Sequence, residues 1–139
     1  MANITIDQFK ELDIRIGTVV KAEVPSWSHW VMKLTVDVGL LDTNPSTSSG
    51  RSGRQKNTIV VFAGIMHFYK AEELEGKQFP FIVNLEKKKI GPEGDFSEGM
   101  MLAADLKIDK PVKIGDEEVF DKPILFYLSE KVPNGTQIR

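Results

Sequence analysis

The chain contains no cysteine among its 139 residues, which excludes disulfide bonds and thiolate metal sites. It has only two histidines, His29 and His67, and neither has a metal-ligand partner at helical spacing. The glycines at positions 91, 94 and 99 are not followed by the Gly-Lys-Ser/Thr sequence of a phosphate loop. We therefore expect a protein that is not an enzyme, with no catalytic residue, no metal and no cofactor.

Long apolar runs are absent as well. No segment approaches the roughly 20 apolar residues that a membrane-spanning helix needs. Residues 1–13 carry acids and lack the apolar centre of a signal peptide. We expect a cytoplasmic protein that makes no membrane contact.

The charge is nearly balanced, with 18 basic and 20 acidic residues and a net charge of −2. Residues 1–89 contain 12 basic and 10 acidic residues, whereas residues 90–139 contain 6 and 10. Domains that bind nucleic acid are usually basic. Any RNA binding by this chain must therefore come from a local patch of cations.

The apolar share of 41% allows one buried core, and the length suits a single domain over residues 1–139. In residues 13–24 an alternating series of side chains predicts a strand with one buried face, and Gly17 predicts a bulge or bend within it. The members of that face are Ile14, Ile16, Thr18, Val20, Ala22 and Val24.

Further strands are predicted by alternation or by short apolar runs between turn residues. They cover residues 31–38 (ending at Gly39), 58–65, 79–85, 99–104 and 124–128, with a small hairpin at 112–114 and 119–120 around Gly115. Thr5 and Gln8 have capping-box spacing for a short helix with Ile6, Phe9 and Leu12 on its apolar face. Residues 71–74 predict one helical turn closed by Gly76.

Residues 40–57 are rich in Ser, Gly, Thr and Asn, which is typical of a flexible loop. The loop carries Arg51, Arg54 and Lys56 but only one acid, Asp42. It is either a solvated linker or a source of phosphate-binding cations.

Six motifs occur in a fixed order: DIRIG at 13–17, LTVDVG at 34–39, TIVVFAGI at 58–65, EELEGK at 72–77, NLEKKK at 84–89 and SEGMMLAA at 97–104. Together they resemble the tRNA-binding domain family. This family occurs in the C-terminal or β subunit of methionyl-tRNA synthetases, in free-standing tRNA-binding proteins and in CsaA-like proteins. The chain departs from the family pattern at Lys87, where proline is usual, at His29-Trp30, where a charged pair is usual, and in the longer segments 40–57 and 91–96.

The resemblance implies an all-β fold, a five-stranded OB-fold barrel over about residues 13–105 with a short helix between strands three and four. Residues 106–139 would form a C-terminal β extension that contacts a second copy in a homodimer. The apolar residues expected outside the barrel are Phe9, Leu12, Phe120, Ile124 and Phe126.

The resemblance also implies an RNA-binding groove. OB folds bind oligonucleotides across strands two and three and the flanking loops. The expected RNA-binding residues are Lys33, Asn84, Lys88, Lys89, Ser97 and Met100, with Trp30, Arg51, Arg54, Lys56 and Lys87 as additional candidates. Each has a structural alternative: Asn84 as a cap, Ser97 as a turn residue, Met100 as core, Trp30 as a cover over the barrel end and the lysines as a solvated run.

Two functions follow from the resemblance. In the first, the protein is a non-catalytic module that binds structured tRNA and assists an aminoacyl-tRNA synthetase, of methionyl type, in trans. In the second, it is a CsaA-like export chaperone that binds unfolded polypeptides, and VPNGTQI at 132–138 is similar to the ending of that group.

Overall fold

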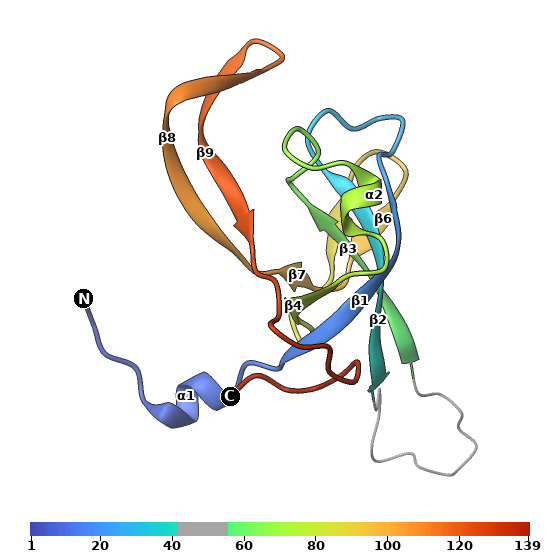
Figure 1. The fold of residues 1–139 in the computed structure, drawn as a ribbon, viewed down its shortest axis with the longest axis vertical. Coiled ribbons are helices and arrows are strands. Elements are labelled where there is room, and N and C mark those ends of the chain that lie inside the picture. Colours follow the sequence, from blue (N-terminus) through green and yellow to red (C-terminus); the bar gives the residue numbers. More distant parts are fainter. Residues whose placement is uncertain (42–55) are drawn as a thin grey trace.

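The structure, a computed structural model, describes residues 1–41 and 56–139. Its centre is a curled antiparallel sheet in the order β3-β2-β1-β4-β7 (Figure 1). The strands are β1 (Ile14–Glu23), β2 (Met32–Leu41), β3 (Lys56–Ala63), β4 (Gln78–Ile82) and β7 (Met100–Met101), and the helix α2 (Ala71–Leu74) lies between β3 and β4 in the chain. The predicted OB-type barrel is confirmed.

Alternation along the strands builds the core. On β2, Leu34, Val36 and Val38 are fully buried, whereas the intervening Lys33, Thr35 and Asp37 are partly exposed. Buried and exposed residues alternate in this way because successive residues of a strand point to opposite faces of the sheet. The largest side chains of the core are Phe79, Phe81, Met32 and Leu74.

The face predicted for β1 is confirmed at Ile14, Ile16 and Ala22, which are buried, and is wrong at Val20 and Val24, which are exposed. A β-bulge lies between Val19 and Lys21, so Val19 is buried while Val20 is 55% exposed. On either side of the bulge, β1 bonds the EELEGK segment: Gly76 N donates to Val19 O (2.8 Å) and Ala22 N donates to Glu75 Oε2 (2.9 Å). An extra residue in one strand reverses the alternation after it.

The barrel closes between β3 and the segment after β6 (Asp95–Ser97). Glu98 N donates to Val60 O at 2.7 Å, and Val60 N donates to the Glu98 side chain at 2.9 Å. Next to this pair, Phe62 N donates to Ser97 Oγ at 3.1 Å. These bonds occupy backbone groups at the edge of β3.

Several predicted strand bounds are corrected by long-range pairing. β2 continues past Gly39 to Leu41, and β4 ends at Ile82 instead of 85. The lysines of residues 87–89 therefore do not leave β4. They enter a separate hairpin, formed by β5 (Lys88–Ile90) and β6, which lies between the predicted strands 79–85 and 99–104.

The predicted strand 99–104 is divided between β7 and the start of β8 (Ala103–Ile114). β8 pairs with β9 (Glu117–Leu125) in one long hairpin, which we call the arm, and it projects from the barrel (Figure 1). The predicted small hairpin around Gly115 is the tip of this arm, and the predicted strand 124–128 ends at Leu125.

The C-terminal tail returns to the barrel. Ile16 N donates to Thr136 O, and Gly135 N donates to Ile16 O. The turn before it is held by side chains, since Thr18 Oγ1 donates to Asn134 Oδ1 at 2.7 Å and Gln78 Nε2 donates to Val132 O at 2.6 Å. Residues 132–138 are thus part of the barrel wall.

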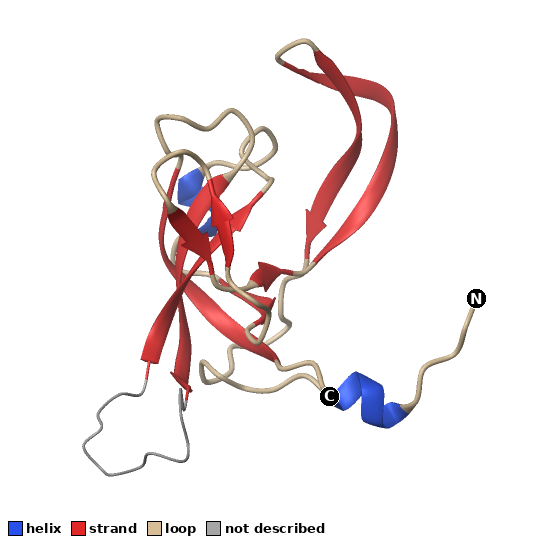
Figure 2. Ribbon diagram, turned by 180° about the vertical axis from the view of Figure 1, so that it is seen from behind, coloured by secondary structure: helices blue, strands red, loops and turns tan. Residues whose placement is uncertain are grey.

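The N-terminal helix α1 (Ile6–Lys10) has the predicted capping box, in which Gln8 N donates to Thr5 Oγ1 at 3.1 Å and Thr5 N donates to Gln8 Oε1 at 2.8 Å. None of its residues is buried. Figures 1 and 2 show α1 and the arm on the same flank of the barrel. Across residues 1–41 and 56–139, no helix is both long and apolar enough to cross a membrane.

Candidate nucleic-acid interface

The β5–β6 hairpin presents the basic side chains of the NLEKKK motif. Lys88 pairs with Ser97 and Lys89 pairs with Phe96 across the two strands. Neighbouring residues of a strand leave it on opposite faces, so Lys88 and Lys89 point in different directions. Both are exposed, as is Lys87 immediately before the strand.

Ser97 holds this hairpin against the barrel. Its hydroxyl accepts from Phe62 N and donates to Gly99 O at 3.1 Å, and the residue is only 9% exposed. The hydroxyl therefore stabilises the closure of the barrel, and little of it faces solvent.

Trp27 supports the turn of the same hairpin. A Cβ added at Gly91 would lie 2.6 Å from Trp27 Cε2, so the indole lies directly against the turn backbone. Gly91 also has a φ of 76°, a conformation that other residues rarely adopt. The indole also packs on Phe62, with ring centroids 6.1 Å apart. Trp27 Nε1 is buried and unpartnered among the described residues, so the ring contributes by packing.

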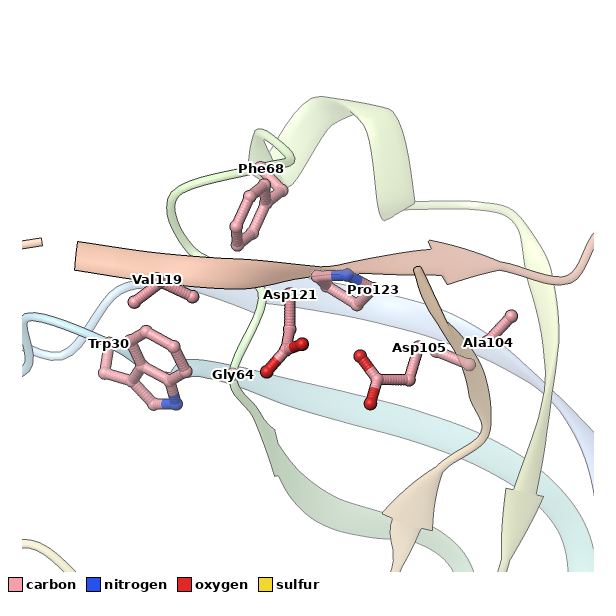
Figure 3. Close-up of a pocket in the computed structure, with 9 residues that line it drawn as sticks. Trp30, Gly64, Phe68, Ala104, Asp105, Val119, Asp121 and Pro123 are labelled. Carbon is pink, nitrogen blue, oxygen red and sulfur yellow. The ribbon is translucent and has the colours of Figure 1, made fainter. Parts of the chain in front are cut away.

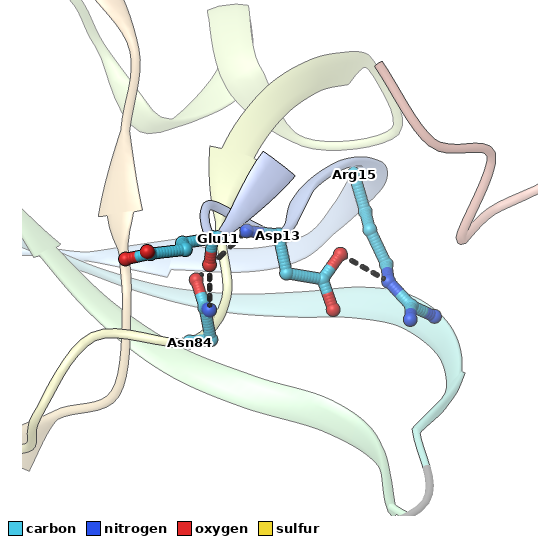
Figure 4. A network of polar contacts seen from close by, with 4 residues as sticks. All are labelled: Glu11, Asp13, Arg15 and Asn84. Carbon is cyan, nitrogen blue, oxygen red and sulfur yellow. Dashed lines mark hydrogen bonds and ion pairs between the residues drawn. The ribbon is translucent and has the colours of Figure 1, made fainter. Parts of the chain in front are cut away.

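Asn84 joins two of the sequence motifs (Figure 4). Asp13 N donates to Asn84 Oδ1 at 2.9 Å, and Asn84 Nδ2 donates to Glu11 O at 2.8 Å. Arg15 Nε in turn donates to Asp13 Oδ1 at 2.8 Å. The side-chain amide thus ties the segment before β1 to the segment after β4.

Lys33 is partly exposed and Met100 is exposed on the barrel surface. Lys33 occupies the outer face of β2 and pairs with Phe62 of β3 and Glu23 of β1. Met100 is 46% exposed on β7 and pairs with Ile82. The outer face of β2 and β3, carrying Lys33, is the face on which OB folds bind oligonucleotides.

Trp30 lies in a cleft between the barrel and the arm (Figure 3). The cleft encloses about 220 Å³. A Cβ at Gly64 would collide with Trp30 Nε1, so the indole lies on the Gly64 backbone, and Trp30 is 42% exposed. The opposite wall carries the carboxylates of Asp105 and Asp121.

Lys107 neutralises part of this acidic wall. Its Nζ lies 2.6 Å from Asp121 Oδ1 and 3.2 Å from Asp105 Oδ2. These hydrogen bonds, first to Asp121 and then to Asp105, raise the pKa of Lys107 above its ordinary value of 10.5. Acids beside Trp30 oppose the approach of a phosphate backbone, so this cleft suits RNA less well than the hairpin does.

The structure says less about the remaining candidate RNA-binding residues. Lys56 begins β3, and Arg51 and Arg54 lie outside the described residues. His67 Nε2 contacts His29 O and links two loops. In the parts of the chain that are described, no group of three His, Asp or Glu side chains could hold a metal ion.

Sequence reasoning missed Trp27 and Phe96. Both depend on the β5–β6 hairpin, whose only local signal is the pair of turn glycines Gly91 and Gly94, both with positive φ. A two-stranded hairpin of three residues per strand is too short for alternation to reveal.

Comparison with known proteins gives a consistent group of relatives. A methionine–tRNA ligase from Methanothrix thermoacetophila is 41% identical over 116 residues, which cover 84% of this chain and 14% of the ligase. One from Clostridium tetani is 31% identical over 136 residues, covering 98% of this chain and 17% of the ligase. The chain thus spans less than one fifth of these relatives. No family model matches it.

Two solved structures share the fold over nearly the whole chain. A MetRS related protein from Pyrococcus horikoshii has a TM-score of 0.73 and 29% identity, covering 100% of both chains. The chaperone CsaA from Bacillus anthracis has a TM-score of 0.68 and 26% identity, covering 99% of this chain and 100% of that chain.

Proposed function

The chain belongs to the tRNA-binding domain family, and from this membership we propose that it is a non-catalytic, single-domain module that binds structured tRNA. The observation that carries the proposal is the β5–β6 hairpin. It presents three exposed lysines beside the outer face of the barrel, and it is fixed there by Ser97 and Trp27. A basic patch held rigidly loses little conformational freedom when it meets phosphates.

We assign different roles to the candidate residues. Lys88, Lys89 and Lys33 contact phosphates, and Met100 packs against a sugar or base. Asn84 and Ser97 stabilise the fold and do not contact RNA, because their polar groups already bond the protein. Additional cations come from Lys87, Lys56, Arg51 and Arg54, and Trp30 would contact RNA only at the margin.

Filter binding of labelled tRNA across a range of salt concentrations tests this function. We expect moderate affinity that tolerates tRNA identity and whose logarithm declines linearly with the logarithm of salt. Lys88→Ala or Lys89→Ala should reduce the slope by about one unit if that side chain neutralises one phosphate. Lys110→Ala, an exposed lysine on the arm, is the matched control. Affinity that does not change with salt would contradict the proposal.

The proposed partner beyond tRNA is an aminoacyl-tRNA synthetase of methionyl type, assisted in trans in the cytoplasm. The similarity to methionine–tRNA ligases supports this choice. A pull-down of the synthetase in the presence and absence of tRNA tests it, and capture of the enzyme only when tRNA is present would indicate that RNA bridges the two.

We also propose a homodimer. An apolar cavity of about 500 Å³ opens on the surface where the C-terminal tail meets β1 and β4. Its lining includes Ile16, Pro80, Leu102, Phe126, Leu128 and Ile138. The uncovered helix α1 and Leu106 and Phe120 of the arm add exposed apolar surface. Large exposed apolar patches are typical of protein interfaces.

The same apolar cavity supports the second candidate function, a CsaA-like chaperone for unfolded polypeptides. The similarity to CsaA over 99% of the chain adds to it. Parallel binding measurements with labelled tRNA and with a permanently unfolded polypeptide separate the two functions. Binding of the polypeptide alone would reject the tRNA proposal.

A further inference from the structure

We propose that Phe96 and Lys89 form a nucleotide-binding site, in which an unpaired RNA base stacks on the Phe96 ring while Lys89 contacts the adjoining phosphate. The inference rests on the proposed tRNA binding and assigns to the β5–β6 hairpin a second mode of contact besides charge. Every base has an aromatic face, so such stacking is tolerant of sequence.

The position of Ser97 determines where Phe96 points. The Ser97 hydroxyl bonds Phe62 N and Gly99 O, so its side chain is turned into the barrel closure. Adjacent strand residues leave on opposite faces. Phe96 therefore points away from the barrel, and it is 50% exposed.

Lys89 shares this outward face because it is the cross-strand partner of Phe96. Directly opposed side chains in an antiparallel pair are close enough to interact. The aliphatic stem of Lys89 runs toward the turn, with Cε 3.9 Å from the position that a Cβ would take at Gly94. The ring of Phe96 and the stem of Lys89 thus leave the same face of the hairpin from paired positions.

The outward face is also favourable in charge. Asp95, the one acid within β5 and β6, pairs with Ile90, and alternation places it on the Ser97 side. The Phe96–Lys89 face therefore carries a cation and an aromatic ring without a strand carboxylate. This combination matches the basic grooves with stacking aromatics that bind single-stranded nucleic acid.

The hairpin is supported well enough to present this pair. Two-stranded hairpins are marginal in isolation. Here β6 is bonded to β3 through Ser97, and the turn lies on the indole of Trp27, which in turn packs on Phe62. Pre-organisation of this kind reduces the entropy lost on binding.

The test measures binding of the full protein chain to two ligands: a short single-stranded RNA that carries 2-aminopurine, and whole tRNA. Stacking quenches 2-aminopurine fluorescence. Phe96→Leu keeps apolar bulk and removes the ring, Phe96→Trp keeps an aromatic face, and Lys89→Ala removes the cation. We expect Phe96→Leu to abolish quenching and to weaken tRNA binding by about 5-fold to 150-fold without changing the salt slope. Lys89→Ala should lower the slope by about one unit.

Phe96→Trp provides a second readout that does not depend on the leucine variant folding. Its added indole should lose fluorescence when RNA binds, beyond any change of Trp27 and Trp30 in the parent. Two results would overturn this site: quenching that survives in Phe96→Leu, or an added indole whose fluorescence does not change on RNA binding. If the parent still binds tRNA in that case, the proposed function stands. A parent protein that binds no RNA in either assay would overturn both.

Discussion

At the scale of single residues, Gly17 illustrates how closely β1 and β2 approach. A Cβ at this position would lie 2.7 Å from Val36 Cγ1 and 2.9 Å from the Asp37 carbonyl oxygen. Its φ is not in the left-handed region, so space and not backbone conformation requires glycine here. The bulge of β1 lies further along, at Val19–Lys21.

Gly17→Ala should therefore destabilise the fold by overpacking, by about 1–3 kcal/mol. Urea unfolding measures this change. Val20→Ala is the matched control on the same strand, since Val20 is 55% exposed and its truncation should change stability by less than about 0.5 kcal/mol. Equal stability of Gly17→Ala and the parent would mean that β1 and β2 separate easily at this point.

Asn84 is the residue for which the structure favours a structural role over the RNA contact implied by resemblance. Both groups of its amide bond backbone atoms of the segment before β1. We expect Asn84→Ala to lower the free energy of unfolding by about 1–2 kcal/mol and to leave the tRNA dissociation constant of the folded protein unchanged. Weaker tRNA binding at full stability would instead place Asn84 in the interface.

At the scale of elements, the arm depends on the barrel for its position. Tyr69, between β3 and α2, packs against the core and donates from its hydroxyl to Pro123 O of β9 at 2.8 Å. Where the arm joins the barrel, Leu125 at the end of β9 is buried in the core. The hairpin is otherwise largely exposed along both strands.

Tyr69→Phe removes only the hydroxyl and should cost about 1 kcal/mol because the carbonyl of Pro123 loses its partner. Hydrogen exchange of β9 amides should accelerate while exchange in β2 and β3 changes less. Tyr127→Phe is the matched control, since Tyr127 is 58% exposed and contacts Phe79 through its ring. Uniform acceleration over all strands would show that the arm does not open separately.

The elements also show how far sequence reasoning extends. Alternation and capping identified β1, β2, β3, α1 and α2, because these depend on neighbours within a few residues. Beside the bulge of β1, Ala22 bonds Glu75, which is 53 positions away, and β6 is held to β3 by a bond between Ser97 and Phe62, 35 positions apart. Patterns within a few neighbouring residues cannot predict contacts between residues so far apart in the sequence. The motifs identified the family, and only the structure brought Asn84 to Asp13 and Phe96 to Lys89.

At the scale of the whole molecule, apolar side chains of α1 and of the arm are left uncovered, and these two elements lie on the same flank of the barrel (Figures 1 and 2). Ile6 of α1 is 65% exposed and Phe126 beside the cavity is 47% exposed. A small domain buries a limited share of its surface by itself. Covering this flank with a second copy would remove apolar area from water, which stabilises association by about 25 cal/mol per Å² before the entropic cost of binding.

We therefore expect a dimer by sedimentation at micromolar concentration, with more than about 1,000 Å² buried in total. Its unfolding midpoint should rise with protein concentration, because association stabilises the folded state by mass action. Phe126→Asp should produce a monomer, since it would bury an unpaired carboxylate in the interface. Val20→Asp puts the same charge on an exposed apolar position of β1 and should remain dimeric. A monomeric parent, or an unfolding midpoint independent of concentration, would contradict the dimer, and the apolar cavity would then be open to an unfolded polypeptide.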